Sequence, residues 1–93
     1  MYKPLPEELR LGFSEIHDIG LFAKQNIKVG TNFGMTHIQI SDTLIRTPLG
    51  GFINHSENAN CIKQENSSNL YLKTIKDIEE GEEITLKYTI YNL

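Results

Sequence analysis

Short runs of alternating apolar and polar residues, separated by turn residues, are the feature that most constrains this fold. The clearest run lies near the C-terminal end and has a large apolar or aromatic residue at every second position: Ile84, Leu86, Tyr88 and Ile90. Side chains two positions apart lie on the same face of a β-strand, so this run predicts a strand with one apolar face. No stretch of the chain has the spacing of a long amphipathic helix. The pattern therefore predicts a mostly β domain with little helix.

The same criteria predict the remaining elements. Residues 1–8 contain two prolines and two glutamates, and we expect an extended arm there, at the start of a single domain over residues 1–93. Alternation or apolar runs predict strands at 9–13, 21–23, 31–40 (interrupted by Gly34) and 70–75. Turn-rich or polar composition predicts connections at 14–20 and 41–48, and a loop at 64–69.

Composition supports a β fold and excludes several classes of protein. Ile, Val and Thr, which suit pleated surfaces, account for 20 of the 93 residues. The net charge of −3 predicts no direct nucleic-acid binding, because such proteins usually carry a basic surface. No apolar stretch approaches the roughly 18 residues of a membrane span, and the N-terminus lacks the apolar core of a signal peptide. A single cysteine cannot form an internal disulfide, which favours a cytoplasmic, intracellular protein.

Residue types alone do not define a catalytic site. His55 and Cys61 are too few ligands for a zinc site, so we expect no metal. His55 and Ser56 are adjacent and cannot form the usual pair of nucleophile and base, and no phosphate-binding glycine loop occurs. Cys61 fits a buried small apolar residue better than a nucleophile. The segment from Asn54 to Cys61 is then either a plain polar loop or a ligand-binding loop.

Three segments, in order, resemble the motifs of SET domains, the family of S-adenosylmethionine-dependent protein lysine methyltransferases. Residues 51–61 (GFINHSENANC) resemble the family's asparagine–histidine signature. Residues 77–88 (DIEEGEEITLKY) resemble its last motif, a Gly-Glu-Glu turn followed by a strand that ends in tyrosine. Residues 19–23 (IGLFA), with Asn26, Ile27 and Gly30, resemble the first motif. Together the three segments span nearly the whole chain.

The resemblance implies a fold and a cofactor site. The family has the β-clip fold of small curved sheets, in which the C-terminal segment threads through a loop to form a pseudoknot. The cofactor would be S-adenosylmethionine, with S-adenosylhomocysteine as the product. Glu82 would brace the knot. By resemblance, the residues that contact the cofactor would be Ile19, Gly20, Leu21, Phe22, Phe52, Asn54 and His55, with Asn54 at the methionine part and His55 at the adenine.

Tyr88 is the catalytic residue that the resemblance implies. The reaction would transfer a methyl group to the ε-amine of a protein lysine, and a phenol hydroxyl at the end of a narrow channel would orient the amine. Phe33, Tyr71 and Tyr91 are candidates for the channel wall. For all four aromatic residues, plain packing in the core is the alternative interpretation.

Several positions depart from the family pattern. Asp18 replaces a common glycine, Gly51 a common arginine, Glu57 a frequent cysteine, Ala59 a frequent proline, and Lys87 a usual acid. About ten residues, around 40–49, stand where many members carry a substrate-gripping subdomain, and the sequence ends five residues after Tyr88, without a zinc-binding tail.

In these respects the chain resembles the minimal SET proteins of viruses and phages, some of which are homodimers. We therefore expect that the chain can form a homodimer. If the source is viral, we expect the protein to act inside an infected host cell. Two alternatives stay open: a non-catalytic SET-like binding module, and a methyltransferase that acts on a non-protein amine.

Overall fold

The protein is a small, mostly β domain with one short helix. The computed structural model describes residues 5–92, with the backbone alone for 88–92. The elements in chain order are β1 (Leu9–Phe13), β2 (Ile19–Ala23), β3 (Asn32–Ile40), β4 (Thr43–Arg46), α1 (Pro48–Phe52), β5 (Asn54–His55), β6 (Cys61–Asn66), β7 (Asn69–Thr74) and β8 (Glu83–Asn92). In this described part of the chain, no helix is long and apolar enough to cross a membrane.

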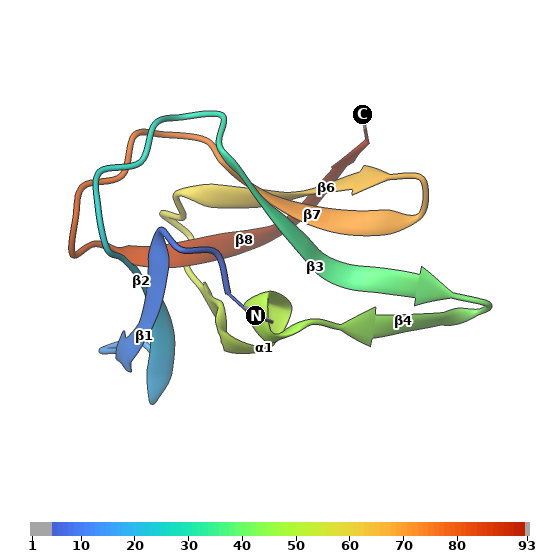
Figure 1. Cartoon of the computed structure of the whole chain (residues 1–93), viewed down its shortest axis with the longest axis horizontal. Helices are drawn as coiled ribbons and strands as arrows, with labels where there is room; N and C mark the ends of the chain where they lie inside the picture. Colours follow the sequence, from blue (N-terminus) through green and yellow to red (C-terminus); the bar gives the residue numbers. More distant parts are fainter. Residues whose placement is uncertain (1–4, 93) are drawn as a thin grey trace.

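The long strand β8 holds the domain together (Figure 1). The strand order is β1-β2-β8-β6-β7-β3-β4, and β5 also pairs with β8. Strands β5 and β6 run parallel to β8, whereas the other pairs are antiparallel. Elements that are distant in sequence therefore meet along one strand, which is the arrangement that the family resemblance implies.

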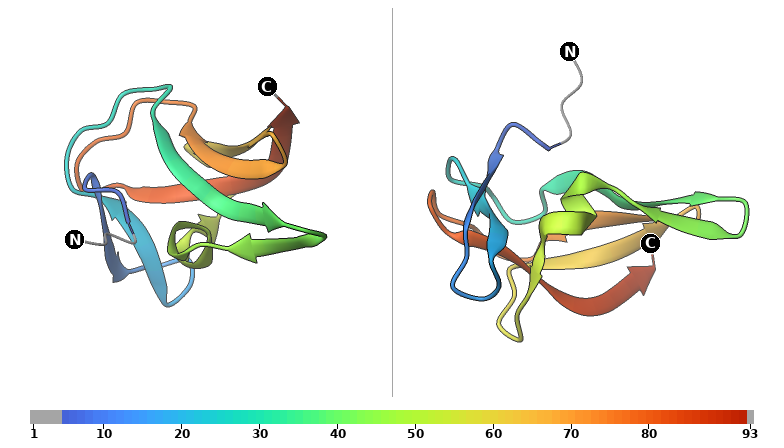
Figure 2. Two further views of the ribbon diagram at one scale, coloured as in Figure 1. Left: turned by 45° about the vertical axis from the view of Figure 1, so that its right-hand side comes forward. Right: turned by 90° about the horizontal axis from the view of Figure 1, so that it is seen from below.

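The connection between β5 and β6 crosses β8, and this crossing forms the predicted pseudoknot. Leu86 of β8 pairs with His55 on one side and with Cys61 on the other. Residues 56–60 must therefore carry the chain from one edge of β8 to its opposite edge (Figure 2). Ser56 adds a backbone hydrogen bond, in which its N–H donates to the carbonyl of Leu86 at 3.1 Å.

Asn60 fastens this crossing to β8. Its side chain is buried, with Nδ2 donating to the carbonyl of Glu83 at 2.9 Å and Oδ1 accepting the N–H of Thr85 at 2.9 Å. Its own carbonyl accepts the N–H of Ile75 at 2.9 Å. The Asn60 amide thus provides hydrogen-bond partners for two backbone groups of β8, at the point where the crossing loop lies beside the strand. Buried polar groups need such partners, because water cannot reach them.

The core confirms the alternation seen in the sequence. Leu70, Leu72 and Thr74 of β7 are buried, whereas the residues between them are not. In β8, Ile84 and Leu86 are fully buried as expected. Thr85, on the other face of β8, is also buried, and its N–H donates to the buried side chain of Asn60.

Two predicted connections are wrong, because both segments form hairpins. Residues 43–46 form β4, whose four residues are all exposed, so no apolar alternation marks it. The predicted loop at 64–69 continues β6 to Asn66 and begins β7 at Asn69. The two residues between them, Ser67 and Ser68, both have positive φ values of 52° and 71°. That backbone suits a two-residue hairpin turn, but Ser-Ser is not the Asn-Gly sequence that normally indicates one.

The short helix α1 packs tightly on β3. Thr47 caps it, accepting the N–H of Gly50 at 3.3 Å, and Pro48 follows at the first helical position. Thr47 also donates to the carbonyl of Met35 at 2.6 Å, which fastens the cap to β3. A Cβ atom at Gly50 would collide with the backbone carbonyl of Thr36, whereas one at Gly51 would meet nothing. The two neighbouring glycines therefore have different roles.

We expect Gly50→Ala to lower the free energy of unfolding by about 1–3 kcal/mol, because α1 or β3 must shift to relieve the collision. The matched variant Gly51→Ala adds the same methyl group to open space, and we expect stability to be unchanged or slightly higher. Urea denaturation followed by circular dichroism measures both. Equal effects of the two substitutions would contradict this account of α1.

We expect Asn60→Ala to cost about 2–4 kcal/mol of unfolding free energy, because the part-buried carbonyl of Glu83 and the buried N–H of Thr85 both lose the Asn60 side chain as their partner. Asn58→Ala is the matched control. The Asn58 side chain is exposed and accepts a hydrogen bond from the exposed Lys76, so its loss should change stability by less than about 0.5 kcal/mol. Chemical denaturation would refute the proposed role of Asn60 if the two variants unfolded at the same urea concentration.

Candidate functional site

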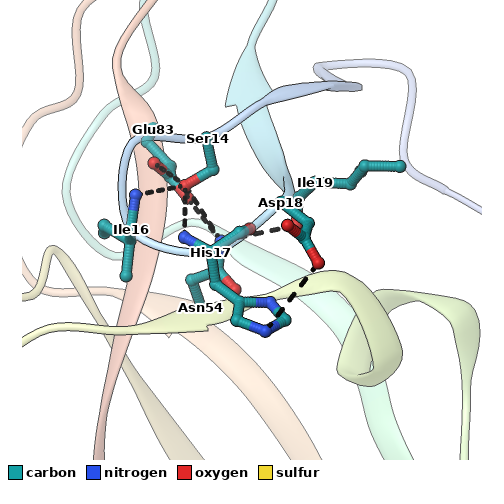
Figure 3. A network of polar contacts seen from close by, with 7 residues as sticks. All are labelled: Ser14, Ile16, His17, Asp18, Ile19, Asn54 and Glu83. Carbon is teal, nitrogen blue, oxygen red and sulfur yellow. Dashed lines mark hydrogen bonds and ion pairs between the residues drawn. The ribbon is translucent and has the colours of Figure 1, made fainter.

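Three parts of the chain meet around the side-chain amide of Asn54 (Figure 3). They are the connection between β1 and β2 at residues 14–18, the short strand β5 that carries Asn54, and the first residue of β8, Glu83. Strand β8 brings them together, because it pairs with β2 through Glu83 opposite Phe22 and with β5 through Thr85 opposite Asn54.

The NH2 group of Asn54 lies among four acceptors. Its Nδ2 is 2.9 Å from Oε2 of Glu83 and 3.1 Å from Oγ of Ser14. The backbone carbonyls of His17 and Ile19 follow at 3.2 Å and 3.4 Å. Because the group has only two hydrogens, the shortest contacts, to Glu83 and Ser14, carry most of the interaction.

Ser14 links the connecting loop to the same carboxylate. Its Oγ is 2.8 Å from both carboxylate oxygens of Glu83, and its single hydrogen is donated to this carboxylate. The same oxygen accepts the N–H groups of Ile16 at 3.0 Å and His17 at 3.4 Å. The hydroxyl therefore closes the turn of its own loop and joins that loop to β8 across 69 positions of sequence.

Gly20 is needed because this network lies against it. A Cβ atom at position 20 would collide with Oε2 of Glu83 and lie 2.9 Å from Nδ2 of Asn54. The family resemblance implies that Gly20 contacts the cofactor. In the structure, two side chains of the protein itself make the close approach.

The described side-chain contact of Glu82, which was predicted to brace the knot, is a local one. Its carboxylate Oε1 accepts the N–H of Glu79 at 2.8 Å and closes the turn before β8. Glu83, one residue further, makes the long-range contacts. The two glutamates were indistinguishable in the sequence, because the strand that begins after the turn decides which of them points toward the loop.

The structure places the other predicted cofactor residues in different surroundings. Leu21 is fully buried in the core, and Ile19 and Phe52 are partly exposed. Phe22 packs within its own hairpin, with the guanidinium of Arg10 5.2 Å from the ring centroid. His55 is half-buried beside Asn54. Ile19, Phe52, Asn54 and His55 thus have side chains that a ligand could reach.

Two of the departures from the family pattern interact with each other. Glu57 lies 3.5 Å from Nζ of Lys87 and 3.4 Å from Nε2 of His55. The hydrogen bond from His55 and the charge of Lys87 lower the pKa of the Glu57 carboxyl. The acid at position 57 and the base at position 87 therefore form an exposed ion pair next to His55.

The predicted channel residues are only partly described. Phe33 is buried in the core cluster, where it packs as the alternative interpretation expected, and Tyr71 is half-buried on β7. The backbone of β8 includes Tyr88 and Tyr91, with Tyr91 opposite Gln64. The side chains of Tyr88 and Tyr91 lie outside the described part of the structure, so their roles stay predictions.

Cys61 is a core residue. It is fully buried, and burial raises the pKa of its thiol to about 12, which keeps it neutral and unreactive at ordinary pH. Among the described residues, no cluster of three or more His, Cys, Asp or Glu side chains could hold a metal ion.

The fold and the site share one arrangement. The last strand of a β domain passes across an Asn-His loop and joins that loop to an N-terminal hairpin. The SET domain family model matches residues 37–89, which is more than half of the chain. The chain belongs to the SET domain family.

Known proteins agree with this assignment. Histone-lysine N-methyltransferase set9 of Schizosaccharomyces pombe is 33% identical over 67 residues, which are 71% of this chain and 15% of the relative. The methyltransferase domain of human PR domain-containing protein 2 superposes with a TM-score of 0.75 at 25% identity, covering 91% of this chain and 79% of that one. A Plasmodium falciparum protein shares the fold with a TM-score of 0.74 at 17% identity, covering 88% and 93%.

Proposed function

We propose that the protein is an S-adenosylmethionine-dependent methyltransferase that modifies the ε-amine of a protein lysine. The observation that carries the proposal is the meeting of Asn54 and His55 with β8 and the loop at 14–18, in a chain of the SET family. The curated relative is named for this activity on histones, and this chain spans 15% of its length.

The polar groups at the site fit the methionine part of this cofactor. An ammonium group needs acceptors, and the side-chain oxygen of Asn54 is one. The carbonyls of His17 and Ile19 accept the NH2 group of Asn54 and each keep a second lone pair. Ile19, Phe52 and His55, which are close in sequence to these polar groups, have partly exposed apolar or aromatic side chains. The bound cofactor would supply the methyl group on a positively charged sulfur. The residues of this chain would bind and orient it.

The protein must also receive the lysine without its proton. A lysine of ordinary pKa is neutral at pH 7 in roughly one molecule in 2,500, a penalty of about 4.6 kcal/mol. A dry channel beside a cationic group disfavours the charged amine and reduces this penalty. Tyr88 would orient the amine for displacement through its hydroxyl, which adds no competing charge.

The narrower features stay proposals. A homodimer could supply channel walls, because the segment between the first two motifs forms only the β3–β4 hairpin and α1. Viral or phage origin and an intracellular location are expected from the sequence alone. The same short segment favours the second candidate function, a SET-like module that binds a partner without catalysis.

We expect the purified protein to transfer radiolabel from S-adenosylmethionine to at least one protein in a cell extract, and to bind the cofactor in calorimetry. Cofactor binding with labelled small amines, but no labelled protein, would favour a non-protein substrate. If the protein binds no cofactor and labels nothing while a known lysine methyltransferase is active in the same extract, the binding module is favoured instead.

We expect Tyr88→Phe to reduce turnover by about 100-fold, as is typical when one oriented hydroxyl is lost from an active site, while cofactor affinity stays within about twofold. Calorimetry for the cofactor and the initial rate of methyl transfer measure the two effects. Loss of folding or of cofactor binding in this variant would show that Tyr88 packs in the core and does not act in catalysis.

A further inference from the structure

We propose that Ser14 and Glu83 are positioning residues that fix the orientation of the Asn54 amide, so that its carbonyl oxygen is presented to an amino group of the ligand. This inference rests on the proposed function and names how one part of the cofactor is recognised. Neither residue contacts the cofactor in this account, because both act through Asn54.

The orientation follows from the chemistry of the surrounding groups. The carboxylate of Glu83 and the carbonyls of His17 and Ile19 can only accept hydrogen bonds, and the hydroxyl of Ser14 already donates to Glu83. All of them therefore favour the NH2 group of Asn54. With the amide turned over, its oxygen would face a carboxylate at 2.9 Å and two carbonyls, which is repulsive.

Fixing the NH2 group inward leaves the Oδ1 atom of Asn54 to face away from the carboxylate. An oxygen held in this way accepts a hydrogen bond from an ammonium group without first reorganising. Preorganisation of this kind raises affinity, because no rotamer has to be ordered on binding. An amide free to rotate would present its NH2 group to the ligand part of the time and repel the ammonium.

Glu83 can do this because its own position is fixed from several sides. Its backbone pairs with Phe22 of β2, and its carbonyl accepts the buried amide of Asn60. Gly20 leaves room for the carboxylate. Ser14 adds a further contact by donating to the carboxylate of Glu83. Its hydroxyl oxygen also accepts the N–H of Ile16, which fixes the loop that carries it.

The test compares two ligands that differ at the amino-acid part. S-adenosylhomocysteine carries the amino and carboxyl groups, whereas methylthioadenosine lacks both. In Glu83→Gln, the new amide can donate as well as accept, so it no longer fixes Asn54. Calorimetry should show S-adenosylhomocysteine binding weakened about tenfold or more, with methylthioadenosine changed by less than about twofold.

Matched variants separate positioning from general stability. Glu80→Gln makes the same chemical change at an exposed position in the turn before β8, and both ligands should bind as in the wild type. Ser14→Ala should weaken S-adenosylhomocysteine selectively, and Ser14→Thr, which keeps a hydroxyl, should restore binding. If Glu83→Gln does not fold, the comparison of Ser14→Ala with Ser14→Thr tests the inference instead.

Each outcome bears on a different statement. Equal weakening of both ligands in the Glu83 and Ser14 variants would show a merely structural role and overturn the inference, as would unchanged binding of S-adenosylhomocysteine. Wild-type protein that binds neither ligand would overturn the proposed cofactor, and with it this inference. If the wild-type protein binds S-adenosylhomocysteine but the variants do not weaken it selectively, the inference is overturned and the proposed cofactor stands.

Discussion

The amide of Asn60 and the two backbone groups that it satisfies on β8 are the contact on which the rest of the structure depends. The connection between β5 and β6 has to cross β8, and a buried crossing leaves backbone donors and acceptors that the regular ladder does not reach. Asn60 supplies both a donor and an acceptor there. With β8 fixed, three other strands find their register against it: β2, β5 and β6.

The candidate site is a consequence of this arrangement. Because β8 begins at Glu83, its carboxylate arrives next to the loop that carries Ser14 and next to Asn54. None of these residues would form a site within its own segment. The polar contacts are made between residues 29 to 69 positions apart, and Gly20 keeps the space that they need. The same strand, β8, therefore forms the knot and contributes Glu83 to the candidate site.

The departures from the family pattern are also better understood in space than in sequence. In the sequence, Glu57 and Lys87 are two separate departures from the family pattern. In the structure they form one ion pair that also includes His55. Because the pair is exposed, it contributes little to stability.

The sequence by itself determined the β class, the alternating strands at 70–74 and 84–86, and the motifs that place Asn54, His55 and Tyr88 in a SET domain, because these signals are local. Only the tertiary structure decided that 43–46 and 64–66 are strands, since the first segment is exposed, the second is polar, and neither carries apolar alternation. Only the tertiary structure separated Glu83 from Glu82 and gave Ser14 and Asn60 their roles. A hydrogen bond between distant segments depends on which side chains the register brings within 3 Å, and no local pattern records that distance.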